Sequence, residues 1–138
     1  MPRILVLEDD QPLGRTVCEA LAHEGHEPSL ATSLPAALEA LDRAPVDLVI
    51  TNVGRMQGDR LDLQRIQVLR ERAPTAKVIV FTGHAQARQL KLDELGLAAV
   101  VLKPADLGQL MAAVTRALDD GAGAPPQESM ERLAPRAR

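Results

Sequence analysis

Residues 3–10 read RILVLEDD, four aliphatic residues in a row followed at once by three acids. An unbroken aliphatic run of this length is typical of a strand with both faces covered, as in a parallel sheet. Similar runs follow at residues 46–51, 77–82 and 98–102, and a weaker one lies at residues 27–31. The pattern predicts five buried strands, the first of which ends in a cluster of carboxylates.

The segments between these strands have the apolar spacing of helices, so the order is strand and helix repeated five times. Such alternation with right-handed crossovers predicts a five-stranded parallel sheet, an α/β fold with two helices on one side and three on the other. The helix signals are Leu13, Val17 and Leu21; Leu34, Leu38 and Leu41, with Ser33 as N-cap; Leu61, Ile66 and Leu69; residues 86–95, ending at Gly96; and Leu107, Leu110, Met111, Val114 and Leu118.

Composition excludes several classes of protein. The net charge is -3, from 16 Lys+Arg against 19 Asp+Glu, so the basic excess of a nucleic-acid or anionic-membrane binder is missing. One cysteine cannot form an internal disulfide. Phe81 is the only aromatic residue, which leaves no platform on which bases could stack.

The 138 residues suit one domain, which we place at residues 1–119. Residues 120–138 are rich in Gly and Pro and lack an apolar stripe, so we expect a disordered C-terminal tail. No apolar run approaches the ~20 residues of a membrane span, and the first run is too short for a signal peptide. We expect a cytoplasmic protein that contacts neither membrane nor DNA directly.

Polar residues stand at the carboxyl ends of four strands, which meet at the edge where open α/β sheets bind ligands. Acids at this edge suit Mg²⁺, while a lysine and a threonine suit phosphate oxygens. The strand-end sequences are Glu8-Asp9-Asp10, Thr51-Asn52, Thr82-Gly83-His84 and Lys103-Pro104.

With their strands (residues 4–10, 46–52, 78–84 and 102–104), these sequences resemble the receiver domains of two-component response regulators. The likeness covers about residues 2–118 and implies the flavodoxin-like receiver fold. It implies that Asp9 is a direct Mg²⁺ ligand and Glu8 an outer one. It also implies that Thr82 and Lys103 sense a phosphoryl group, which an aspartate after the third strand accepts from a histidine kinase.

The phosphoacceptor position holds Asn52 instead of aspartate. An amide is a poor nucleophile because its nitrogen lone pair is delocalised, so it cannot form an acyl phosphate. The substitution also removes a negative charge, so any Mg²⁺ binding is weakened. Two other departures from the family's pattern also favour a receiver that has diverged from phosphorylation. Residues 53–58 lack the family's proline, and Val100 stands where the family has an aromatic switch residue.

A cation could replace the metal. Arg55 and Lys103 could each neutralise Glu8 and Asp9. Each of these residues also has a structural alternative. Arg55 could point into solvent, and the acids could be a solvated start of the first helix, where they favour the helix dipole. Thr82 could be an ordinary strand residue, and Lys103 could lie in a surface loop.

The sequence thus predicts a pseudo-receiver, a signalling module of a phosphorelay system with no catalytic residue and no enzyme activity. It would contact a histidine kinase or a downstream protein through its first helix or the face of fourth helix, fifth strand and last helix. A homodimer through that face stays open. The alternative is a conventional Mg²⁺-dependent phosphoacceptor whose aspartate is represented by an engineered or deamidation-related Asn52. A small-molecule binder would rest on fold analogy alone.

Overall fold

The computed structural model describes residues 1–53, 56–57, 60–61, 63–84, 87, 89–103 and 107–122. In chain order, its strands and helices are β1 (Arg3–Leu7), α1 (Gln11–His23), β2 (Glu27–Ala31), α2 (Leu34–Arg43), β3 (Leu48–Thr51), β4 (Met56–Gln57), β5 (Arg60–Leu61), α3 (Gln64–Arg72), β6 (Lys77–Thr82), α4 (Leu92–Leu95), β7 (Ala99–Leu102) and α5 (Leu107–Ala122).

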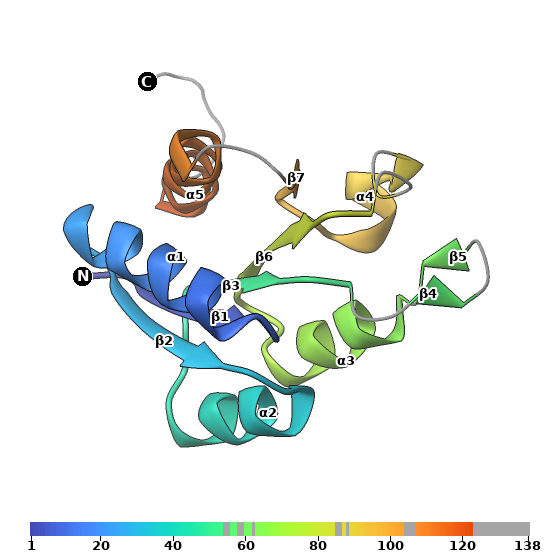
Figure 1. The fold of residues 1–138 in the computed structure, drawn as a ribbon, viewed down its shortest axis with the longest axis horizontal. Coiled ribbons are helices and arrows are strands. Elements are labelled where there is room, and N and C mark those ends of the chain that lie inside the picture. The colour runs from blue at the N-terminus through green and yellow to red at the C-terminus, as the bar shows by residue number, and fades with distance from the viewer. Residues whose placement is uncertain are drawn as a thin grey trace.

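Five strands form one parallel sheet in the order β2-β1-β3-β6-β7, which confirms the predicted fold class (Figure 1). The register sets the carboxyl ends side by side. Leu7 pairs with Thr51, so the residues that follow them, Glu8 and Asn52, leave the sheet at the same level. Thr82 pairs with Leu102, which brings Lys103 to the same edge.

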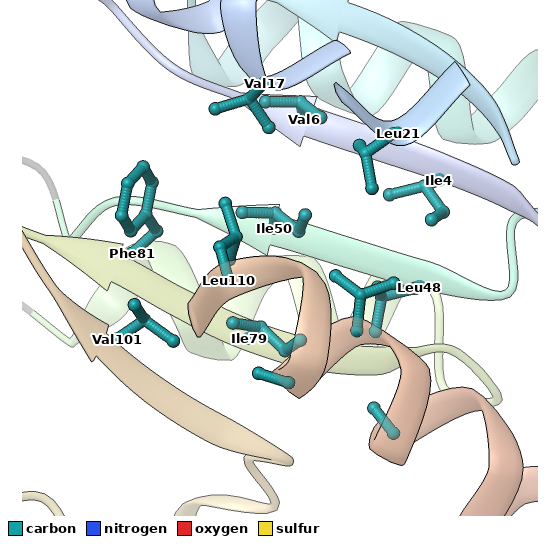
Figure 2. Close-up of a cluster of buried hydrophobic side chains, with 13 residues drawn as sticks. Ile4, Val6, Val17, Leu21, Leu48, Ile50, Ile79, Phe81, Val101 and Leu110 are labelled. Carbon is teal, nitrogen blue, oxygen red and sulfur yellow. The ribbon is translucent and has the colours of Figure 1, made fainter. Parts of the chain in front are cut away.

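Helices cover both faces of the sheet, as predicted: α1 and α5 lie on one face and α2, α3 and α4 on the other (Figure 1). Strand residues alternate between two apolar clusters, so Ile4 and Val6 pack under α1 and α5, whereas Leu5 and Leu7 pack toward α2 and α3. Figure 2 shows the first cluster, where side chains of α1 and α5 meet those of the strands. Burial on both faces is the physical reason for the continuous aliphatic runs.

Local capping sets several helix ends. Ser33 caps α2 as predicted, since its Oγ accepts a hydrogen bond from the Ala36 amide at 3.3 Å. Asp10 caps α1 in the same way, accepting from the Leu13 amide at 3.1 Å. Gly96 ends α4 with a left-handed φ of 68°, a conformation that favours glycine.

The structure corrects two helix predictions. Among the described residues the fourth helix is Leu92–Leu95, shorter than the expected 86–95: the amides of Ala87 and Leu90 donate to carbonyls three residues back, and Lys91 is extended. Residues 86 and 88 of the expected helix lie outside the described residues. Leu61 does not begin the third helix, because it lies in β5, which pairs antiparallel with β4. Apolar spacing alone cannot separate a short hairpin strand from a helical turn.

The C-terminal helix extends beyond the expected domain boundary. α5 continues to Ala122, three residues past 119, and the remainder of the expected tail, residues 123–138, lies outside the described residues. Within the described part of the chain, every helix is too short or too polar to span a membrane.

Replacing Leu21 by alanine should lower the free energy of unfolding by about 2–5 kcal/mol, since a fully buried leucine leaves a cavity. The matched control is Leu92→Ala, because Leu92 is 38% exposed and its loss should cost about 0.5 kcal/mol. Urea unfolding followed by circular dichroism measures both. Equal losses would contradict the assignment of Leu21 to the core.

Candidate functional site

The edge formed by the carboxyl ends of the strands brings most of the predicted site residues into one network. Glu8 and Asp9 follow β1, Asn52 follows β3 and Lys103 follows β7. Their side chains are linked by hydrogen bonds and one ion pair. These four residues, which stand far apart in the sequence, therefore converge at one edge of the sheet.

Glu8 is a buried acid whose charge is compensated by Lys103. Only 6% of the Glu8 side chain is exposed, and its Oε1 accepts a hydrogen bond from Lys103 Nζ at 2.7 Å. The second oxygen, Oε2, accepts from the Asp10 amide at 3.2 Å. A carboxylate removed from water is tolerated only when it is paired and hydrogen-bonded in this way. Lys103 is therefore no surface-loop residue, since it neutralises a buried charge.

Asn52 uses both ends of its amide. Its Nδ2 donates to Glu8 Oε2 and to Asp9 Oδ1, each at 3.4 Å, and its Oδ1 accepts a hydrogen bond from Arg65 Nη1. A carboxamide can act as donor and acceptor at once, whereas an ionised carboxylate only accepts. The side chain thus bridges two acids and one cation.

Arg65 is the functional candidate that the sequence analysis missed. It lies in the first turn of α3, and its Nη1 is 3.7 Å from Asp9 Oδ1 as well as hydrogen-bonded to Asn52. The side chain is only 19% exposed. Of the two cations expected from the sequence, Lys103 bonds Glu8, whereas Arg55 lies outside the described residues. Arg65 is an arginine that the structure places beside Asp9.

The position of Arg65 becomes a signal once the start of α3 is known to be Gln64. The first turn of a helix carries partial positive charge, so acids are favoured there and an arginine is not. The first turn of α3 contains no acid, and its N-cap residue, Leu63, makes no side-chain cap. A cation at this unfavourable position indicates a nearby anion, although the sequence does not say which one.

Thr82 lies at the same edge in a different environment. Its side chain is buried, and its Oγ accepts a hydrogen bond from the His84 amide at 3.2 Å, which supports the turn after β6. Its carbonyl oxygen accepts from the Lys103 amide at 2.8 Å. These contacts give Thr82 a structural role next to Lys103.

The Lys103 ammonium also lies over an aromatic face. Its Nζ is 5.2 Å from the centroid of the Phe81 ring, within the range of a cation–π contact. Phe81 is almost fully buried in the first cluster (Figure 2). Glu8 and Phe81 together hold the ammonium in one place.

The oxygens at this edge do not fit a resident Mg²⁺ ion. Mg²⁺ needs several oxygen ligands in near-octahedral geometry. Here Glu8 accepts from N–H donors at both oxygens, the Asn52 Nδ2 donor faces Glu8 and Asp9, and the Asn52 oxygen accepts from Arg65. Among the described residues, no group of three or more His, Cys, Asp or Glu side chains could hold a metal ion.

Comparison with known proteins gives a consistent result. The family model for the response regulator receiver domain matches residues 4–115. The chain is 29% identical, over 99% of its own length and 73% of the relative's, to the photosynthetic apparatus regulatory protein RegA of Rhodovulum sulfidophilum. It is 33% identical to the transcriptional regulatory protein PcoR of Escherichia coli, covering 83% of this chain and 50% of PcoR. It spans only a quarter of the putative NtrX-like response regulators of Rickettsia.

Solved structures show the same fold. The response regulator TrrA of Thermotoga maritima, determined in complex with Mg²⁺ and BeF, is 28% identical with a TM-score of 0.71, over 86% of this chain and all of TrrA. A sensor protein from Polaromonas is 26% identical with a TM-score of 0.74, over 88% of this chain and 98% of that one.

Replacing Lys103 by methionine should destabilise the protein by about 3 kcal/mol, because Glu8 would keep a buried, uncompensated charge. The matched control is Lys91→Met, since the Lys91–Glu94 pair is exposed and contributes at most about 0.5 kcal/mol. Adding Glu8→Gln to Lys103→Met should recover most of the loss. Denaturant unfolding of the four proteins measures this, and equal effects of the two lysine variants would refute the role given to Lys103.

Proposed function

The chain belongs to the response regulator receiver domains of two-component systems, and from this membership we propose that it is an atypical receiver. In this proposal Asn52 occupies the phosphoacceptor position and is not phosphorylated. The domain then signals by contact with another protein, a histidine kinase or a downstream component, in the cytoplasm. It has no catalytic residue of its own.

The single observation that carries the proposal is the amide of Asn52 at the end of β3, bonded to two acids and one arginine. A carboxamide nitrogen is not a nucleophile, and attack by its oxygen on phosphorus would not give the acyl phosphate that a carboxylate forms. The amide hydrogen-bonds Glu8, Asp9 and Arg65, so the side chain has a structural role and is not free to attack a phosphate donor.

The neighbouring hydroxyl offers no substitute acceptor. Thr51 precedes Asn52, but its side chain is fully buried on the sheet, and its Oγ donates a hydrogen bond to the Asn52 carbonyl oxygen at 2.7 Å. A buried hydroxyl held in this way is inaccessible to a phosphate donor.

Charge balance supports the same conclusion. The two acids, Glu8 and Asp9, are matched by two cations, Lys103 and Arg65, through contacts of 2.7 Å and 3.7 Å. A receiver that needs Mg²⁺ for phosphoryl transfer needs a net negative site to attract it. In this proposal Mg²⁺ binding at the site is weakened.

The surface for protein contact in this proposal is the face of α4, β7 and α5. A hollow there is lined by Leu90, Leu92, Val100, Lys103, Ala113 and Arg116, among others. Lys103 belongs both to this hollow and to the acidic site, so the two are physically continuous. Val100, in place of an aromatic residue, gives this face no ring to swing between positions. Pairing of two copies through this face is one form the contact could take.

Incubating the protein with Mg²⁺ and acetyl phosphate should leave its intact mass unchanged, because Asn52 cannot form an acyl phosphate. A receiver with aspartate at the acceptor position serves as positive control for the reagent. Intact-mass spectrometry and peptide mapping give the readout. Phosphate covalently attached to this chain at Asn52 or elsewhere at the site would sink the proposal and favour the conventional phosphoacceptor.

A further inference from the structure

The position of Arg65 has a consequence for metal binding at the strand edge. Resting on the proposed function, we infer that Arg65 excludes divalent cations from the space beside Asp9 and Asn52. It follows that exchanging Asn52 for aspartate is not sufficient to create a Mg²⁺ site. The guanidinium must be removed as well.

The guanidinium lies where a metal ion would need its ligands. Arg65 Nη1 is hydrogen-bonded to Asn52 Oδ1 and lies 3.7 Å from Asp9 Oδ1. Asn52 Oδ1 and Asp9 Oδ1 are the oxygens that a cation at the ends of β1 and β3 would need as ligands. Only 19% of the Arg65 side chain is exposed, so it is held at the site rather than extended into solvent.

Both oxygens of Glu8 are already engaged. Glu8 Oε1 accepts from Lys103, and Glu8 Oε2 accepts from the Asp10 amide and from Asn52 Nδ2. A divalent ion would have to displace these donors and also approach two fixed positive charges. Each unit of positive charge close to a divalent cation strongly opposes its binding, because the repulsion is proportional to the product of the two charges.

The helix that carries Arg65 adds to this effect. α3 begins at Gln64, so its positive N-terminal end faces the same edge, and no acid of its first turn offsets it. The arginine itself is unfavourable at that helix end. Its contacts with the Asp9 carboxylate and the Asn52 amide oxygen offset this cost and hold the guanidinium in place.

An aspartate at position 52 would meet this guanidinium directly. The added negative charge would lie against Arg65 Nη1, the atom that now donates to the Asn52 oxygen. An arginine and a carboxylate in contact form a strong charge-assisted pair. Arg65, and not a metal ion, would therefore balance the negative charge of this aspartate.

The experiment measures Mg²⁺ affinity alone, with no phosphate donor, by following backbone amide shifts of residues 8–10 and 103 in NMR titrations. Asn52→Asp combined with Arg65→Gln should bind Mg²⁺ at least about tenfold more tightly than Asn52→Asp, since one unit charge beside the ion is removed. Asn52→Asp combined with Arg65→Lys, which keeps the charge, should stay near the affinity of Asn52→Asp.

The matched control is Asn52→Asp combined with Arg72→Gln. Arg72 lies on the same helix and bonds Asp42 at 2.9 Å, away from the site, so this variant loses the same charge elsewhere. Its Mg²⁺ affinity should change less than about threefold, because screening weakens distant charges. Circular dichroism checks the fold of each variant. If the double variant does not fold, Arg65→Gln with Asn52 retained should still bind Mg²⁺ several-fold more tightly than the unaltered protein.

The inference is overturned if Asn52→Asp alone binds Mg²⁺ as tightly as its combination with Arg65→Gln, or if the Arg72 control gains as much. Either result leaves the proposed function standing, because the unaltered chain would still lack an acceptor. Conversely, phosphorylation of the unaltered chain would end the proposed function without deciding these relative affinities.

Discussion

The hydrogen-bonded ion pair between Lys103 and Glu8 is the constraint on which the strand edge depends. β1 and β7 are not neighbours, since β3 and β6 lie between them, yet the ammonium reaches across both strand ends to a carboxylate at 2.7 Å. Glu8 is buried, and an ionised acid in that position requires a partner. The pair thus connects the end of β7, which belongs to the α4–β7–α5 face, with the end of β1 on the other side of β3 and β6. The Asp10 amide and Asn52 Nδ2 donate hydrogen bonds to the second oxygen of the same carboxylate.

Asn52 and Arg65 complete this arrangement in a mutually consistent way. The amide donates to the acids on one side and accepts from the guanidinium on the other, so each polar atom faces a partner of suitable kind. A carboxylate in the same place would set three acids against two described cations. The amide at position 52 and the arginine beside it are therefore two aspects of one charge-balanced site. The proposed function, in which this site takes neither a metal ion nor a phosphoryl group, rests on that balance.

Much of this could be predicted from the sequence, because doubly covered strands need unbroken aliphatic runs and parallel strands align their polar ends. Ser33 and Gly96 marked helix ends correctly, since capping chemistry is local. The errors arose where tertiary pairing decides the outcome: Leu61 has helical spacing but pairs in a hairpin, and the segment before α4 forms tighter turns. Arg65 was missed because the contact joins the start of α3 to the end of β1. No local rule specifies which of several arginines crosses that gap.

The lone aromatic ring beneath the Lys103 ammonium gives the protein an internal reporter. Phe81 is the only phenylalanine, tyrosine or tryptophan in the sequence, so its ring is the main source of any ring-current displacement of the Lys103 side-chain protons. Those protons should resonate upfield while the ammonium remains over the ring, and should return toward ordinary shifts when it leaves. The occupancy of the Glu8–Lys103 contact can thus be followed in the unlabelled, unmodified chain, through a magnetic signature that no neighbouring tyrosine or tryptophan obscures.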